Sequence, residues 1–388
     1  MSPSRTAMKL RSLASSFLLF AAAGGCSSSD APVNIPPDTA PVVDLPARTT
    51  NVSGVLYDPE AFLVAFMTVP EEEAGNALPG LFEGPYTFLS AIMGGQVSLS
   101  SPEGGGALVS APSDFGGTWS VVGAPSGETT AYLASATPPE EPVEPNPDFP
   151  VPMPTTTYFP TTYVRPILAS VTQCYGQAAV LVGNTGALDA VAQAMTEAGT
   201  PTTPADLLDP TKTGGVALLF VHDMSFLADL FQTPVSSIAE ASAGRLFPLD
   251  WAPVEEAPLP GQSPMGFMVL PGSESFLGYF ALVLPPNATE PVTVNLVDTF
   301  VPEPEPDPEA PPRPYLIPPV IVEPRPGEVS VYRAFGQIPM PPGEEPPPGG
   351  GLEDPPPPEP EPTWTCYIPP PPVELPEEPV DPEGPPAE

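Results

Sequence analysis

The chain has 388 residues, of which 68 are proline and 33 are glycine, and its formal net charge is −37. Proline is several times its usual share of about 5%. A chain this acidic has little with which to neutralise phosphate groups, which argues against nucleic-acid binding. Anionic lipid surfaces should repel it too, so a basic membrane-binding patch is excluded.

The first 25 residues have the order of a secretory signal. Arg5, Lys9 and Arg11 precede an apolar segment from about Leu13 to Ala23, and small residues follow. This segment is too short to span a bilayer, which takes about 20 apolar residues. We therefore expect export from the cytoplasm.

Cys26 stands between Ala23-Gly24-Gly25 and Ser27-Ser28-Ser29. This stretch resembles the lipobox of bacterial lipoproteins, although leucine is commonest where Ala23 stands. The resemblance implies that residues 1–25 are removed, that Cys26 carries acyl chains such as palmitate, and that residues 26–50 form a flexible tether. A serine after the cysteine implies the outer membrane of a Gram-negative envelope. An ordinary signal peptide with an incidental cysteine is the alternative.

Proline density divides the rest of the chain. Residues 51–136 and 163–300 are poor in proline, whereas residues 137–162 and 301–388 are rich in it. Proline lacks the backbone donor and fixes φ, so the rich segments are interpreted as a linker and a long Pro/Glu-rich C-terminal tail. The poor segments are each about the size of a small domain.

The first window consists mainly of short β-rich runs separated by Gly, Pro, Asp and Ser. Val97 and Leu99 alternate with serines, as a strand with one buried face requires. Several such runs favour an antiparallel sandwich over 51–136. The predicted strands are 51–58, 61–68, 95–101, 106–111, 117–123 and 129–136.

The segment from Ser113 to Gly127 carries an aspartate, turn glycines, an aromatic residue and a Pro-x-Gly turn. These are Asp114, Gly116 or Gly117, Trp119, Pro125 and Gly127. The segment resembles the carboxypeptidase regulatory-like (transthyretin-like) β-sandwich family, as does the opening run with Gly54, Val55 and Asp58. The resemblance covers about 90 residues and implies a β-sandwich, and related Ig-like sandwiches share much of the pattern. The physical chemistry agrees, because Trp119 can fill the space between two sheets.

The second window, 163–300, is predicted to repeat the sandwich plan with one or two helices inserted. The β-rich runs are 214–223, 264–272, 276–286 and 293–300. Leu188, Val191 and Met195 share one helical face, with Thr185 as the expected cap and Gly199 as the end of the helix. A second short helix is expected around Phe226–Phe231. A divergent α+β domain is the alternative.

The tail contains apolar islands at 313–324, 327–338 and 363–370. Val329 and Val331 alternate like strand residues, and Trp364, Tyr367 and Ile368 flank Cys366. We expect at least one island to dock on a globular domain as an edge strand. The last dozen residues should stay mobile.

If Cys26 carries lipid, Cys174 and Cys366 remain. An even remainder in an oxidising compartment suggests one disulfide, and two free thiols are the alternative. The single His222 gives no zinc site. The acids sit between prolines and not in a spaced calcium loop, so no metal or cofactor is expected.

Candidate catalytic groups are few. His222, with Asp223 and Ser225, is the one His–Ser–acid candidate, but sequence neighbours on a strand point to opposite faces. The acidic run Glu71–Glu73 is interpreted as a solvated loop. Trp119 and Tyr132 suggest either a sugar-stacking platform or core residues.

The sequence thus predicts a mainly β, non-enzymatic protein of the cell envelope, anchored by lipid. Its role would be structural or adhesive, with an envelope protein or polysaccharide as partner. The alternative is a carbohydrate-binding surface module.

Overall fold

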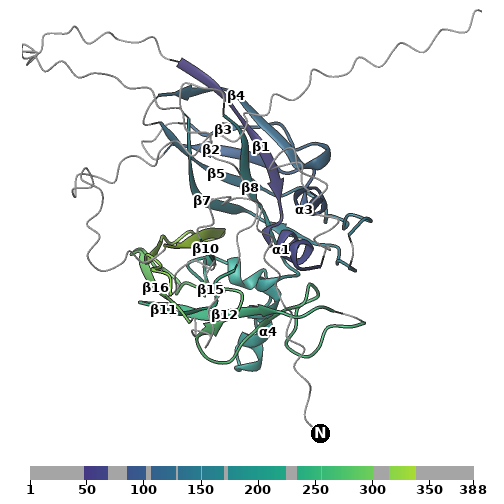
Figure 1. The fold of residues 1–388 in the computed structure, drawn as a ribbon, viewed down its shortest axis with the longest axis vertical. Helices are drawn as coiled ribbons and strands as arrows, with labels where there is room; N and C mark the ends of the chain where they lie inside the picture. Colours follow the sequence, from purple (N-terminus) through teal and green to yellow (C-terminus); the bar gives the residue numbers. More distant parts are fainter. Residues whose placement is uncertain are drawn as a thin grey trace, which may run out of the picture. The chain divides into compact units, whose positions relative to one another are not determined.

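A computed structural model of the protein describes residues 48–68, 85–101, 106–127, 130–149, 151–169, 174–223, 234–254, 256–299 and 314–337. These residues are mainly β, which confirms the predicted fold class (Figure 1). Among them, the helices longer than one turn are α1 (Pro59–Thr68), α3 (Pro85–Ser90) and α4 (Ala187–Glu197). No helix in the described ranges is long and apolar enough to cross a membrane.

A nine-stranded sheet runs through the described unit in the order β13-β12-β15-β10-β18-β7-β5-β2-β3. Its strands are β2 (Gln96–Ser100), β3 (Leu108–Val109), β5 (Ala131–Thr137), β7 (Thr161–Leu168), β10 (Val216–Asp223), β12 (Arg245–Trp251), β13 (Phe267–Val269), β15 (Tyr279–Val283) and β18 (Val329–Gly336).

Three smaller sheets complete the described fold, in the orders β4-β1-β8, β14-β11-β16-β17 and β6-β9. Their strands are β1 (Arg48–Tyr57), β4 (Thr118–Ser126), β6 (Tyr158–Phe159), β8 (Cys174–Val180), β9 (Val182–Gly183), β11 (Ser237–Ala241), β14 (Glu274–Ser275), β16 (Val292–Asp298) and β17 (Val320–Val322). Two 3-10 turns, η1 (Phe115–Gly117) and η2 (Asp206–Leu208), connect neighbouring elements.

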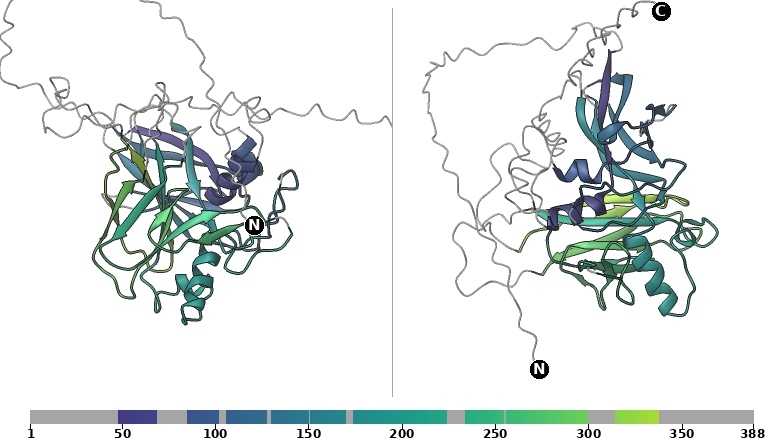
Figure 2. Two further views of the ribbon diagram at one scale, coloured as in Figure 1. Left: turned by 60° about the horizontal axis from the view of Figure 1, so that its bottom comes forward. Right: turned by 90° about the vertical axis from the view of Figure 1, so that its right-hand side faces the viewer.

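The arrangement of the strands differs from two separate antiparallel sandwiches. Strands from both proline-poor windows share the nine-stranded sheet, and β8 of the second window pairs with β1 of the first. Three pairings are parallel: β1 with β8, β10 with β18, and β18 with β7. Even the predicted linker contributes, because Tyr158 and Phe159 form β6. Figure 2 shows the layers from two further sides.

The tail supplies a central strand where an edge strand was expected. β18 lies between β10 and β7, with Val331 paired to both Leu218 and Tyr163. β17 of the same tail adds an edge strand on β16. The island at 363–370 and the helix expected at Phe226–Phe231 lie outside the described residues.

Both faces of β10 are buried, which explains its unbroken apolar sequence. Val216, Leu218 and Phe220 pack into a core that includes α1 and α4, while Ala217 and Leu219 face a second core with β11 and β16. A third core lies between β1 and β4 on one side and β2 and β5 on the other, and it contains Trp119.

The run 61–68, predicted as a strand, is the helix α1. The reason lies just before it. The side-chain oxygen Oδ1 of Asp58 accepts hydrogen bonds from the backbone N–H groups of Glu60 (2.8 Å) and Ala61 (3.1 Å). Pro59 occupies the first helical position, where its missing N–H costs nothing. An apolar helix is buried on most sides, so it shows no polar face in the sequence.

Helix α4 agrees with the prediction except at its start. It covers Ala187–Glu197, and Gly199 follows it with φ +91°. Gly186 stands at the N-cap and Thr185 does not cap the helix. The side-chain acceptor at this end comes from elsewhere in the chain, namely Glu60, which accepts the N–H of Ala187.

Candidate functional site

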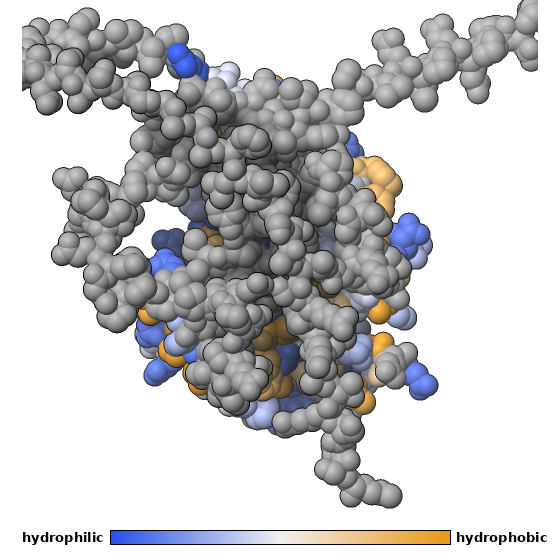
Figure 3. Space-filling model, in the orientation of Figure 1, coloured by the Kyte–Doolittle hydropathy of each residue, from blue (hydrophilic) through white to orange (hydrophobic). Residues whose placement is uncertain are grey.

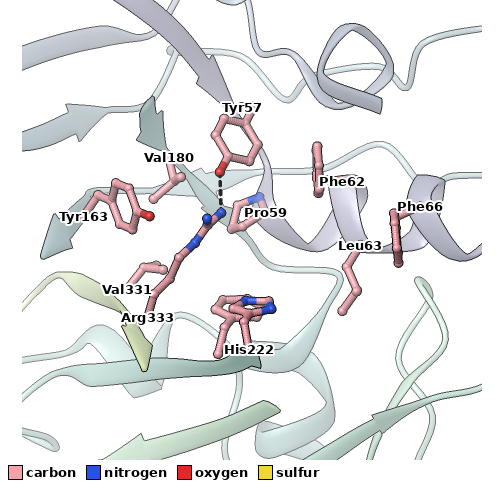
Figure 4. Close-up of a pocket in the computed structure, with 11 residues that line it drawn as sticks. Tyr57, Pro59, Phe62, Leu63, Phe66, Tyr163, Val180, His222, Val331 and Arg333 are labelled. Carbon is pink, nitrogen blue, oxygen red and sulfur yellow. Dashed lines mark hydrogen bonds between the residues drawn. The ribbon is translucent and has the colours of Figure 1, made fainter. Parts of the chain in front are cut away.

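A small pocket lies where the end of β1 and the start of α1 face β7, β10 and β18 (Figure 4). Its cavity volume is about 50 Å³. Most of its walls are aromatic or aliphatic. The lining residues are Tyr57, Pro59, Phe62, Leu63, Phe66, Tyr163, Val180, Phe220, His222, Val331 and Arg333.

Polar groups gather on one side of this pocket. The Nη2 atom of Arg333 donates a hydrogen bond to the hydroxyl of Tyr57 (2.9 Å), and the Arg333 guanidinium lies 5.6 Å from the centre of the Tyr163 ring. Tyr163 is 2% exposed, and its hydroxyl has no hydrogen-bond partner among the described residues. In Figure 4 this hydroxyl and the guanidinium point into the same part of the pocket.

The other side of the pocket is apolar. Phe62, Leu63 and Phe66 of α1 line it, on the opposite side of Figure 4 from Tyr163. The Phe62 ring lies 5.7 Å from the Tyr57 ring. The pocket therefore has a cationic, hydrogen-bonding end and an apolar end.

A column of rings leads from this pocket to a buried pair of carboxyl groups. The His222 ring stacks on Phe220 (6.2 Å, 8° between planes), and Phe220 stacks on Tyr279 (4.2 Å, 13°). The hydroxyl of Tyr279 donates to Oε1 of Glu60 at 2.6 Å. The pocket and the carboxyl pair thus form one continuous region around the start of α1.

Asp58 and Glu60 are both fully shielded from solvent, with exposures of 1% and 0%. Oδ2 of Asp58 accepts a hydrogen bond from the hydroxyl of Tyr158 (3.1 Å) in addition to the two backbone bonds at the start of α1. Oε1 of Glu60 accepts from the N–H of Ala187 (2.7 Å) as well as from Tyr279. Oε2 of Glu60 makes no hydrogen bond within the described part of the chain.

This burial favours the neutral form of both acids. Burial raises the pKa of Glu60 to about 8, and the charge of nearby Asp58 acts on that pKa in the same direction. Burial also raises the pKa of Asp58, to about 6, against the opposing effect of the backbone N–H groups of Ala61 and Glu60. Glu60 is therefore largely protonated at neutral pH, and its proton is carried inside the core.

Gly186 explains how a carboxyl group reaches the start of α4. A Cβ atom at this position would lie 2.0 Å from Oε2 of Glu60. Glycine is therefore required by the close approach of this side chain. Asp58 accepts hydrogen bonds at the start of α1 and Glu60 accepts one at the start of α4, so the two acids have a structural role.

The residues selected from the sequence are spread over the structure. His222 lines the pocket, but the side chains of Asp223 and Ser225 lie outside the described residues, as do Cys26, Cys366 and Glu71–Glu73. The backbone of Cys174 pairs with Val52 at the start of β8, and its side chain is not described, so the disulfide stays a prediction. In the described residues, no group of three metal-binding side chains occurs.

Trp119 and Tyr132 belong to the core. They are 3% and 4% exposed, which contradicts the sugar-stacking platform and agrees with their alternative interpretation as packing residues. The hydroxyl of Tyr132 donates to the carbonyl of Pro125 (2.7 Å). Asp114 accepts a hydrogen bond from the Thr118 hydroxyl across the turn that precedes Trp119.

The pocket was not predicted from the sequence, because its walls come from five segments far apart in the chain. Asp58-Pro59-Glu60 was the one local signal, since an aspartate before a proline and an acidic residue is a common helix start. Nothing in the sequence indicates that Tyr163, His222 and Arg333 meet. Their meeting depends on the parallel pairing of β18 with β7 and β10.

Comparisons with known proteins give no family. No family model matches the chain, and no curated protein matches it. One solved structure that matches is that of a streptococcal ancillary pilin. It is 8% identical, the match covers 75% of this chain and 69% of that one, and the TM-score is 0.16. That score is too low to support a conclusion about fold or function.

Proposed function

We propose that this chain is a lipid-anchored protein of the bacterial cell envelope, with a structural or adhesive role and no catalytic activity of its own. The outer membrane of a Gram-negative cell is the proposed location. An envelope protein or a polysaccharide would be the partner. The stretch from Ala23 to Cys26, at the end of a secretory-type leader, is the observation that carries the proposal.

The spacing between Cys26 and the described fold suits an anchor. The first strand begins at Arg48, so 22 residue steps separate it from the cysteine. A Ser/Pro-rich stretch of that length reaches at most about 70 Å at ~3.1 Å per residue. That distance is enough to hold a folded unit clear of lipid headgroups. Acyl chains on the sulfur would supply the membrane affinity that the acidic surface cannot.

The strand that follows the tether is held on both edges. β1 pairs with β4 along one side and with β8 along the other, from Val52 to Val55 on both. Val52 and Leu56 are fully buried. A pull on the tether must therefore break two ladders of hydrogen bonds and expose core residues. This construction supports a role in which the fold carries load between a membrane and a partner.

Metabolic labelling with palmitate tests the anchor, with Cys26→Ala and Cys174→Ala compared in the native host. We expect label in the wild-type and Cys174→Ala proteins and none in Cys26→Ala, which should leave the membrane fraction. Label retained by Cys26→Ala, or absent from the wild type, would overturn the proposal.

Carbohydrate binding is the second candidate, and one exposed aromatic pair favours it. Phe88 and Phe115 are 37% and 72% exposed, and their ring centres lie 5.5 Å apart. On the face in Figure 3, hydrophobic side chains reach the surface in several separate places. A glycan array probed with the wild type and with Phe115→Ala tests this. If the wild type binds no glycan on the array, or if Phe115→Ala binds the same glycans equally well, carbohydrate binding at this aromatic pair is rejected.

A further inference from the structure

We propose that segment 363–368 of the tail adds a strand to β8, at one edge of the sheet β4-β1-β8, and that a disulfide between Cys366 and Cys174 fixes it there. The tail would then close onto the sheet that contains β1, the strand next to the tether. This goes beyond the disulfide expected from the cysteine count, because it assigns the surface on which the segment docks. It rests on the export that the proposed function includes, but not on lipid at Cys26.

The edge position of β8 is the first observation. In its sheet β1 is the central strand, and β8 pairs with it in parallel from Cys174 to Val180 (Figure 1). No described strand pairs with the other side of β8. Its sequence CYGQAAV contains no charged residue and no proline, which are the usual protection of an exposed edge. Such an edge can bind an extended segment as one more strand.

Segment 363–368 has the sequence of a strand. It reads TWTCYI, which consists of β-branched residues, aromatic residues and one cysteine, and it carries no charge in a tail rich in proline and glutamate. Trp364, Cys366 and Ile368 alternate with two threonines and a tyrosine, as a strand with one apolar face requires. Prolines on both sides limit this strand to six residues.

The two cysteines select β8 among the edges of the fold. Cys174 holds the register position opposite Val52 of β1. Neighbouring strands lie about 4.8 Å apart, within the Cα separation of about 4.4–6.8 Å that a disulfide requires. An added strand with Cys366 opposite Cys174 therefore meets this requirement. The same register would place Trp364 and Ile368 on the face of the sheet that Val52 occupies, and Val52 is fully buried.

The connecting segment is long enough for the tail to reach β8 of its own chain. Residues 338–362 lie between Gln337, the last described residue, and the proposed strand. A proline-rich segment of that length spans up to about 80 Å, at ~3.1 Å per residue. A compact unit of about 290 residues has a radius of gyration of about 19 Å. The connection also raises the effective concentration of the segment above that supplied by a second copy.

Formation of the bridge is a two-electron oxidation. The two thiols lose two protons and two electrons as the S–S bond forms. A thiol–disulfide exchange protein takes up both electrons and both protons, so that its own disulfide becomes a dithiol. Compartments outside the cytoplasm maintain oxidants of this class, which is why the bridge depends on export in the cell.

Peptide mapping without reductant tests the bridge. The protein is the full chain carrying Cys26→Ala, which keeps two cysteines, after purification and oxidation in a glutathione redox buffer. We expect one pair of peptides joined through Cys174 and Cys366, in a monomer. Hydrogen exchange tests the strand. The backbone amides of residues 363–368 should exchange at least about 10-fold more slowly than those of residues 349–354 in the connecting segment.

Two variants separate docking from oxidation without docking. Trp364→Asp puts a charge on the apolar face of the proposed strand and keeps both cysteines. Because burial of the tryptophan ring would stabilise the docked strand, the equilibrium constant for forming the bridge should fall at least about 10-fold. Leu352→Asp is the matched control, since it makes an apolar-to-acidic change in the connecting segment, outside the proposed strand. It should form the bridge as the parent does.

Two free thiols in the oxidised protein would overturn the proposal, and so would a bridge that joins two chains. A bridge within one chain would still refute the added strand if residues 363–368 exchange as fast as the connecting segment. Equal bridge formation by Trp364→Asp and Leu352→Asp would refute it as well. The oxidation uses purified protein without Cys26, so failure of export or of lipidation in the host leaves these results unchanged, and the two proposals fail independently.

Discussion

Replacing Glu60 by Gln should make the protein more stable at alkaline pH and leave it nearly unchanged in acid. Glu60 is buried, and its Oε1 atom accepts hydrogen bonds from Ala187 and Tyr279. The glutamine oxygen can accept both of these bonds. The substitution therefore removes the titration of this side chain while it keeps the contacts that join α1 to α4.

The magnitude follows from the raised pKa of Glu60. Its pKa is about 8 in the folded protein against an ordinary value of 4.5. Between these values the unfolded chain has lost the proton and the folded protein has kept it. The unfolded state then binds fewer protons, so the free energy of unfolding falls as pH rises, by about 1.4 kcal/mol per pH unit. From pH 5 to pH 8 the loss is about 3–4 kcal/mol.

Urea denaturation at pH 5, 6.5 and 8, followed by tryptophan fluorescence, measures the effect. The difference in unfolding free energy between Glu60→Gln and the wild type should grow by about 3–4 kcal/mol across this range. Glu240→Gln is the matched control, because Glu240 is exposed on β11. It should follow the wild-type profile. If Glu60→Gln and the wild type lose stability in parallel, Glu60 is not held neutral and the reasoning fails.

Three further predictions concern the described fold. Tyr163→Phe should raise the free energy of unfolding by about 1–2 kcal/mol in urea, because it removes a buried hydroxyl without a partner among the described residues; a loss of stability would show that this hydroxyl is satisfied. Gly54→Ala should unfold the protein or lower its free energy of unfolding by more than about 3 kcal/mol, because the new Cβ would lie 1.6 Å from the Gln177 carbonyl oxygen. Gly106→Ala is the control, since a Cβ there meets open space, and its thermal unfolding followed by circular dichroism should match the wild type. A chain ending at Gln337 should melt cooperatively, and one ending at Thr299, which lacks β18, should not; cooperative melting of both would contradict a central β18.

Local patterns predicted individual strands well. Val97 and Leu99 are fully buried while Ser100 is exposed, as the period of two requires. The helix at 187–197 was found because its apolar face repeats along several turns. Such signals depend on residues close in sequence, so the sequence alone carries them.

The errors arose where a local pattern fits two structures or where distant parts of the chain decide the structure. The apolar run at 61–68 suits a buried strand and a buried helix equally, and the cap by Asp58 decides for the helix. The alternation of Val329 and Val331 with other residues predicts a strand, but no local pattern indicates that this strand lies between β10 and β7. The high proline content of residues 301–388 predicts a tail separate from the domains, but β18 of this segment is part of the largest sheet.

The pocket depends on a local sequence signal and on long-range strand pairing. Tyr57 and Phe62 are neighbours through the β1–α1 turn, which the sequence signals by Asp58-Pro59. Arg333 joins them from 276 residues away. A contact at that separation depends on the topology of the whole sheet, so the candidate site could not be assembled from the sequence.

The mass of the mature N-terminus decides whether the protein is anchored by lipid. The protein is extracted from membranes of its native host and digested, and the N-terminal peptide is identified by mass spectrometry. We expect a peptide that begins at Cys26 and carries acyl chains linked through the sulfur. A peptide that begins at Met1, or one that begins at Cys26 with an unmodified thiol, would contradict the anchor and with it the proposed function.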